Sequence, residues 1–202
     1  MLRPKRIPLF PLDVVLLPEM SLPLHIFEPR YKLMIERCLS ENLEFGMILA
    51  GNKKAATTGC TAEIVKKLRE YPDGRSDILA EGRAVFRLTE LLDEKDYYEG
   101  IVEYVADHPA RLDLESEKRL VQAFEQCHHL LFGRPWLDAN REQPATLAFR
   151  MAALLPLDLD RRQTLIETRT EGSRRDLLHG WIEALLPKLA DAHRARQRHT
   201  LN

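Results

Sequence analysis

The chain reads Leu22-Pro23-Leu24-His25-Ile26-Phe27-Glu28-Pro29-Arg30-Tyr31 from residue 22 to residue 31. The first residues of this stretch predict a short strand. Pro23 has no N–H to give to a sheet ladder, which favours an edge or an irregular pairing. Pro29 suits the first position of a helix. We expect that helix to bury a face with helical spacing, made of Tyr31, Met34, Ile35, Cys38 and Leu39.

Short strand patterns broken by turns continue on both sides of this stretch, up to about residue 110. The other expected strands are 7–12, 45–49, 61–65, 77–80, 84–88 and 98–105. Tyr71-Pro72-Asp73-Gly74 should close a hairpin, because Pro fixes φ at about −65° and Gly accepts a positive φ. Glu81-Gly82-Arg83 should reverse the chain between the next two strands. Strands at this spacing favour a small barrel over a parallel sheet.

From about residue 112 the apolar residues recur with helical spacing. A first helix should bury a face that includes His128, and a second should begin at Pro144 and end at Pro156. Asp158 is a candidate N-cap for a third helix. Ser173 resembles the start of a capping box for a fourth. The second half is therefore predicted to be all helical.

The fold class that follows is α+β, with a β-rich domain over residues 1–110 and a helical bundle over residues 111–202. The chain has 202 residues, of which 45% are hydrophobic, and this is enough for a core without metal or disulfide support. The formal net charge of −1 gives no overall attraction to nucleic acid or to an anionic membrane. The N-terminus lacks the apolar segment of a secretory signal, and three cysteines without a C-x-x-C motif are typical of reduced thiols. We expect a cytoplasmic protein.

Motifs for common enzyme chemistry are absent from the sequence. It contains no P-loop, no G-x-G-x-x-G, no H-E-x-x-H and no G-x-S-x-G. Cys127-His128-His129 is the densest cluster of metal-ligand types, but neighbouring residues on a helix point about 100° apart and do not chelate one ion by themselves. We therefore expect no cofactor and no metal site.

The stretch 22–31, with Pro8-Leu9-Phe10-Pro11-Leu12 before it, resembles the hallmark of the amino-terminal, substrate-binding domain of the Lon protease family. The match continues in order through Phe45-Gly46, Pro72-Asp73-Gly74-Arg75, Phe86-Arg87-Leu88 and Leu155-Pro156-Leu157. The resemblance covers nearly the whole chain. It implies a PUA-like β pseudo-barrel followed by a helical bundle, in agreement with the residue patterns.

The resemblance also implies recognition rather than catalysis. The ATPase and peptidase modules of the family would follow this domain, so we expect a free-standing, non-catalytic version that binds unfolded or extended polypeptide, or a partner protease. Pro72-Asp73-Gly74-Arg75-Ser76 superficially resembles the peptidase motif of the family. Arg75 and Asp77 depart from that motif, however, and Lys118 lies among acidic residues that keep a lysine charged. The alternatives are an RNA-binding PUA-like module and, more remotely, a peptidase or a small-molecule enzyme.

Two groups of residues are candidates for contact with a partner. The first lies in the hallmark stretch: His25, Glu28, Arg30 and Tyr31. Its polar members would either form a local hydrogen-bonded network that fixes the strand-to-helix junction or touch the partner directly. The second group is the hairpin tip: Pro72, Asp73, Gly74 and Arg75. An exposed tip is available for recognition.

Overall fold

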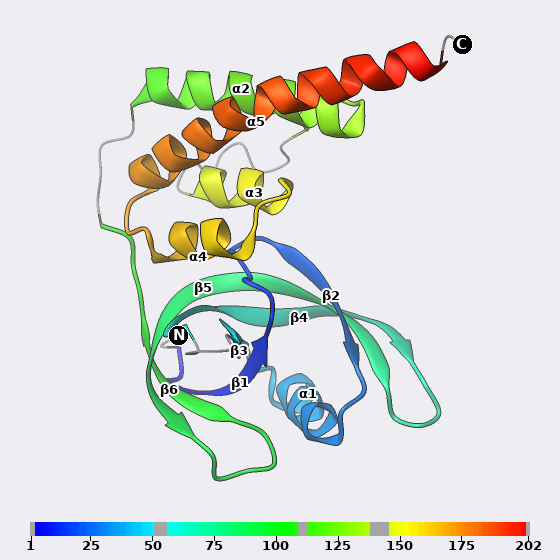
Figure 1. Cartoon of the computed structure of the whole chain (residues 1–202). Coiled ribbons are helices and arrows are strands. Elements are labelled where there is room, and N and C mark those ends of the chain that lie inside the picture. The colour runs from blue at the N-terminus through cyan, green and yellow to red at the C-terminus, as the bar shows by residue number, and fades with distance from the viewer. Residues whose placement is uncertain (1–2, 51–55, 109–112, 138–145, 201–202) are drawn as a thin grey trace. The chain divides into compact units, whose positions relative to one another are not determined.

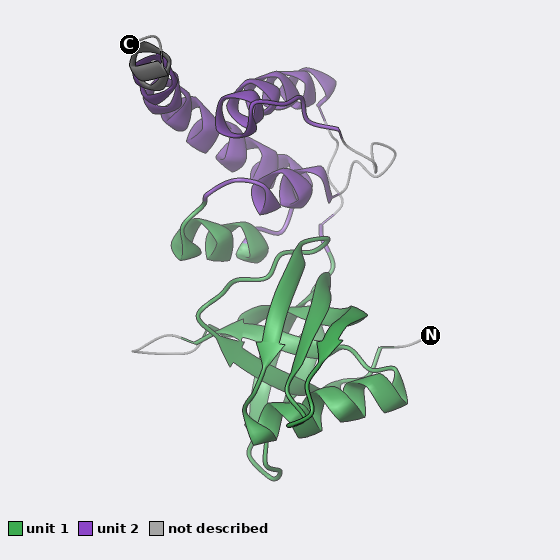
Figure 2. Cartoon of the chain, turned by 90° about the vertical axis from the view of Figure 1, so that its right-hand side faces the viewer, with its two compact units in different colours: residues 1–106, 157–167 green, residues 107–156, 168–202 purple. Residues whose placement is uncertain are grey.

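The computed structural model describes residues 3–50, 56–108, 113–137 and 146–200, with side chains described up to residue 195. The chain forms two compact units, coloured separately in Figure 2. The first unit contains residues 1–106 and 157–167, and the second contains residues 107–156 and 168–202. Residues 157–167 thus pack with the first unit, whereas the division at residue 110 places them in the second.

Within the described residues, the first unit contains a mixed sheet of six strands (Figure 1). The strands are β1 (Arg6–Leu12), β2 (Ser21–Ile26), β3 (Phe45–Leu49), β4 (Thr58–Glu70), β5 (Ser76–Leu92) and β6 (Glu99–Tyr104). Their order is β2-β5-β4-β3-β1-β6, and a further pairing of β5 with β6 closes the sheet. The β1–β3 pairing is parallel and the others are antiparallel. The predicted barrel is confirmed.

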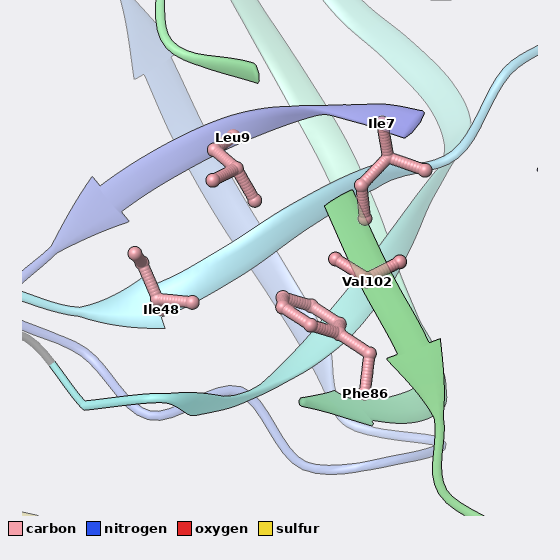
Figure 3. Close-up of a cluster of buried hydrophobic side chains, with 5 residues drawn as sticks. All are labelled: Ile7, Leu9, Ile48, Phe86 and Val102. Carbon is pink, nitrogen blue, oxygen red and sulfur yellow. The ribbon is translucent and has the colours of Figure 1, made fainter. Parts of the chain in front are cut away.

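The centre of the barrel is a cluster of aliphatic and aromatic side chains from β1, β3, β5 and β6 (Figure 3). It consists of Ile7, Leu9, Ile48, Phe86 and Val102, each at most 3% exposed. Burying a side chain of this size contributes about 1.5–3 kcal/mol. These contacts between strands distant in the sequence hold the sheet closed.

The predicted chain reversal at Glu81-Gly82-Arg83 is wrong. Strand β5 runs without interruption through these residues, from Ser76 to Leu92. Gly82 is needed for a different reason: a Cβ built on it would lie 2.1 Å from the carbonyl oxygen of Leu17. The backbone N–H of Gly82 donates to the Met20 carbonyl, and its own carbonyl accepts from the Glu19 N–H. The glycine therefore permits a close backbone approach rather than a turn.

Helix α1 (Pro29–Glu41) begins at Pro29, as predicted, and its C-cap residue is Asn42, which has a φ of 53°. Tyr31, Met34, Ile35 and Cys38 are buried. Leu39, which the spacing placed on the same face, is 42% exposed.

Helix α4 (Leu159–Glu167) belongs to the first unit. Asp158 caps it as predicted, since its Oδ1 accepts the backbone N–H of Arg161 at 2.8 Å. The side-chain amide of Gln163 donates to the Thr58 carbonyl on β4 at 3.2 Å. This helix therefore packs against the sheet.

The second unit contains α2 (Leu114–Phe132), α3 (Leu147–Ala153) and α5 (Glu171–Thr200). His128 is buried on α2, as predicted. The expected helix start at Pro144 lies outside the described residues. The predicted cap at Ser173 is wrong: α5 begins two residues earlier, and the Oγ of Thr170 accepts the Ser173 N–H at 3.1 Å.

A buried carboxylate organises the second unit. Glu171 accepts hydrogen bonds from the Nε atoms of Arg174 and Arg175, at 3.0 and 3.1 Å, and from the backbone N–H of Ala148, at 2.9 Å. Both arginines are 1% exposed. The guanidinium of Arg174 also lies 4.3 Å from the ring centroid of Phe149.

Each helix of the described ranges is too short or too polar to cross a membrane.

Candidate functional site

His25 lies on β2 opposite Asp77 of β5. The Nδ1 of His25 is 2.5 Å from Oδ1 of Asp77, and the hydroxyl of Tyr71 donates to Oδ2 of Asp77 at 2.8 Å. The hydrogen bonds from His25 and Tyr71 hold the pKa of Asp77 below its usual range. The hallmark stretch is thereby joined to the β4–β5 hairpin.

Aromatic and arginine side chains surround this carboxylate on the outer face of the sheet. The ring of His25 stacks on Phe27 with centroids 5.9 Å apart, and Phe27 is 58% exposed. The guanidinium groups of Arg69 and Arg75 lie 4.6 and 5.1 Å from the ring centroid of Tyr71. Aromatic residues and arginine are enriched at protein–protein interfaces.

The other hallmark residues form a second, separate group. Glu28 occupies the N-cap position of α1 without a side-chain capping bond, and it accepts from the Nε of Arg30 at 2.9 Å. The guanidinium of Arg30 lies 4.5 Å from the ring centroid of Tyr31. Tyr31 is 5% exposed and packs on Phe10, and burial raises its pKa. The expected single network is therefore split: Glu28 pairs with Arg30, and His25 pairs with the hairpin.

The hairpin tip has the predicted turn. Gly74 has a φ of 79°, and its N–H donates to the Tyr71 carbonyl at 2.9 Å. The Arg75 side chain donates to Oδ2 of Asp73 at 2.6 Å, and Lys32 of α1 donates to the Asp73 carbonyl at 2.9 Å. The backbone and side-chain bonds from Arg75 hold the pKa of Asp73 below its usual range. The tip is exposed, yet it is anchored to α1.

A groove lies between α1 and residues 63–70 of β4, called here the outer half of β4. The sequence patterns did not predict it. One cavity of about 610 Å³ is lined by Lys32, Ile35, Glu36, Leu39, Ser40, Lys67, Glu70, Gly74 and Ser76. A smaller cavity of about 190 Å³ is lined by Cys38, Leu39, Asn42, Leu43, Glu44, Glu63 and Ile64. Leu39 lines both cavities, and the two together are called here the α1–β4 groove.

Ser76 and Lys118, the residues that superficially resemble a peptidase pair, are poorly placed for catalysis. Ser76 is 8% exposed. The ammonium of Lys118 donates to Glu115 at 2.8 Å, and its side chain is 72% exposed, so nothing desolvates it into a base. Burial raises the pKa of Cys38 to about 12, which keeps this thiol protonated. Among the side chains described, no cluster of three or more His, Cys, Asp or Glu residues could hold a metal ion.

A sequence model of the ATP-dependent protease La (LON) substrate-binding domain matches residues 6–183. The chain belongs to this family. It is 27% identical over 211 residues to Lon protease 1 of Syntrophobacter fumaroxidans, covering 95% of this chain and 25% of that protein. It is 26% identical over 210 residues to the Lon protease of Escherichia coli strain K12, covering 95% and 26%. The chain thus spans about a quarter of the length of these relatives.

Solved structures of Lon N-terminal domains have the same fold. The Lon N-terminal domain protein from Xanthomonas campestris superposes with a TM-score of 0.71 at 27% identity, over 87% of this chain and 98% of that one. The N-terminal domain of the Mycobacterium avium complex Lon protease gives 0.65 at 16% identity, which shows the fold alone. The family and the fold class that the sequence predicted are confirmed. The match is to the Lon substrate-binding domain and not to the ATPase or protease domains.

Proposed function

We propose that this Lon substrate-binding domain is a non-catalytic module that recognises extended or unfolded polypeptide, either as the recognition part of a protease system or as an adaptor. The observation that carries the proposal is the family match over residues 6–183. The three cysteines are free and buried, as is typical of a reducing compartment, and we place the protein in the cytoplasm.

The geometry of the first unit supports recognition through its surface. The outer face around His25 and the hairpin tip Pro72–Arg75 combine aromatic, guanidinium and backbone groups in a fixed arrangement. Glu28 and Arg30 are part of the proposed partner surface, since their side chains are 39% and 42% exposed. Buried Tyr31 supports this surface from below by its contact with Arg30.

The absence of catalysis is part of the same proposal. It rests on the exposed, ion-paired Lys118 and the nearly buried Ser76. We expect the purified chain neither to hydrolyse ATP nor to cleave casein. Turnover that disappears in Ser76→Ala would overturn this part.

The binding experiment uses the full chain and reduced, carboxymethylated α-lactalbumin, which stays unfolded under native conditions. Fluorescence anisotropy of the labelled probe should report micromolar binding, because ordering a flexible chain offsets part of the contact energy. Apolar and backbone contacts are insensitive to salt, so binding should persist from about 50 to about 500 mM salt. Native α-lactalbumin is the control and should not bind. No binding of the unfolded probe would contradict the proposal.

A single-stranded RNA probe in the same assay tests the alternative of a nucleic-acid module. Residues 1–110 contain 15 basic and 18 acidic residues, so the barrel lacks the excess of cations that phosphate contact requires. We expect no RNA binding. Tight RNA binding that weakens steeply with salt would favour the alternative.

A further inference from the structure

The outer half of β4 has a strand partner on one side only. Among the described residues, β3 pairs with β4 through Phe45–Ala62, Gly46–Thr61 and Met47–Cys60, and the pairing stops there. On its other side, β4 continues to pair with β5 as far as Glu70. Figure 1 shows the β4–β5 hairpin extending beyond β3. Residues 63–70 of β4 therefore form an open sheet edge.

The register explains why this edge is open. Because β3 is antiparallel to β4, a longer β3 would place Glu44 opposite Glu63 and Leu43 opposite Ile64. Leu43 and Glu44 instead follow directly after Asn42, the C-cap residue of α1, which has a left-handed conformation. The chain thus enters β3 from α1 at this point, and the α1–β4 groove lies between the helix and the strand.

The groove has the chemistry of an extended polypeptide site. The open edge offers unpaired backbone N–H and C=O groups, which only another extended backbone satisfies in a regular way. Leu39 presents an apolar surface in both parts of the groove, and the edge itself exposes Val65 and Leu68 at 40% and 48%. At about 3.3 Å per residue, residues 63–70 can align a segment of about eight residues.

We propose that residues 63–70 of β4, together with α1, bind an extended segment of an unfolded polypeptide as an additional antiparallel strand in the α1–β4 groove. The segment takes the position that a longer β3 would occupy, and its alternate side chains contact Leu39. This inference rests on the proposed function. To the partner surface proposed above it adds a neighbouring site, which includes Gly74 of the hairpin tip, and a mode of binding.

Two irregularities in β4 limit what this edge accepts. The pairing with β5 shifts register around Val65 and around Leu68, so each is a bulge residue without a cross-strand partner. Bulges and exposed lysines such as Lys66 and Lys67 are typical protection against uncontrolled edge-to-edge pairing. The bulges allow only short runs of regular pairing, which favours a short, exchangeable segment over a long aggregating ladder.

Hydrogen exchange of the wild-type chain tests the site without any substitution. With saturating reduced, carboxymethylated α-lactalbumin, backbone amides in residues 63–70 should exchange at least about fivefold more slowly, since open-edge N–H groups become bonded. Helix α2 (Leu114–Phe132), which belongs to the second unit, should be unchanged. Protection on β2, or on the outer face around His25, without protection of 63–70 would overturn the inference.

A matched pair of variants on α1 tests the groove. Leu39→Glu places a charge in the groove and should weaken binding of the same probe about tenfold. Leu33→Glu is the control, because Leu33 is on the same helix, is 47% exposed and does not line the groove. Wild-type binding by Leu39→Glu would refute the groove while leaving the proposed function intact. Failure of the wild-type chain itself to bind the probe would refute both.

Discussion

Glu99 shows how a single buried carboxylate can link several elements of the barrel unit. It lies on β6 and is 2% exposed. Its oxygens accept from Arg6 of β1 at 2.6 Å, from Arg37 of α1 at 2.7 Å and from Lys95 at 3.0 Å. Burial by itself would raise the pKa of Glu99, but the three cations outweigh burial and lower it to about 2. The ionised carboxylate therefore holds α1 and β1 to the sheet.

We expect Glu99→Gln to lower the free energy of unfolding by about 2–3 kcal/mol at neutral pH. A lowered pKa in the folded state stabilises the fold above the usual pKa of about 4.5, and this stabilisation is lost as the pH falls toward 2. The difference between wild type and variant should therefore shrink over that pH range. Urea unfolding at several pH values measures it.

Glu94→Gln is the matched control for this experiment. Glu94 also bonds Arg6, at 2.8 Å, but its side chain is 62% exposed. Exposed ion pairs contribute at most about 1 kcal/mol. If both variants lost equal stability with equal pH dependence, burial of Glu99 would not be the cause.

Glu28, in the hallmark stretch, should matter much less for stability. Its side chain is 39% exposed, and its partner Arg30 is two residues away on the same surface. We expect Glu28→Ala to lower the free energy of unfolding by less than about 1 kcal/mol. Thermal unfolding measures this. A loss above about 2 kcal/mol would show that the strand-to-helix junction depends on the carboxylate, as a single network would require.

Among the elements, those that depend on neighbouring residues could be predicted from the sequence. Pro29 begins α1 and Gly74 has the positive φ of a hairpin turn, and both requirements lie within a few residues. The role of Gly82 could not be predicted because it depends on a distant residue: the Leu17 carbonyl leaves no space for a Cβ. Local sequence patterns do not show that a distant carbonyl lies this close to a glycine.

The candidate site divides in the same way. Exposure of the tip Pro72–Arg75 follows from its turn sequence, and the structure has it exposed. The pairing of His25 with Asp77 needs the β2–β5 register, and the open edge of β4 needs the β3–β4 register. Register depends on contacts between distant strands, so the α1–β4 groove could not be predicted from local spacing.

Helix α4 is the element whose packing the sequence did not predict. Its cap at Asp158 follows from local chemistry, but its contact with β4 does not. We expect the hydrogen exchange of the α4 backbone amides to change together with that of the barrel amides, because both belong to the first unit. Phe86→Leu, in the barrel core, should accelerate exchange in Leu159–Glu167, since destabilising a cooperative unit exposes all its amides together.

Phe124→Leu is the matched control for α4, because Phe124 is equally buried but lies on α2 of the second unit. It should accelerate exchange in α2 and α5 and leave α4 unchanged. Acceleration of α4 by Phe124→Leu but not by Phe86→Leu would assign the helix to the second unit. Mass spectrometry of the exchanged chain distinguishes these results.

At the scale of the whole molecule, each unit contains its own buried carboxylate network. Glu99 serves the barrel unit, and Glu171 serves the helical unit. Among the described contacts, the residues that bond Glu99 lie in the first unit and those that bond Glu171 lie in the second. The proposed polypeptide surface lies in the barrel unit, so destabilising the helical unit should leave binding in place.

Glu171→Ala tests this separation. It removes the acceptor for two arginines that are each 1% exposed and for the Ala148 N–H. Breaking a buried ion pair by deleting one partner costs about 3–5 kcal/mol, so exchange in α5 should accelerate strongly. The barrel strands should keep their protection, and anisotropy with carboxymethylated α-lactalbumin should be unchanged. Glu117→Ala, which deletes a partially exposed partner of Arg175, should have a smaller effect. Lost binding with an intact barrel would show that the helical unit takes part in recognition.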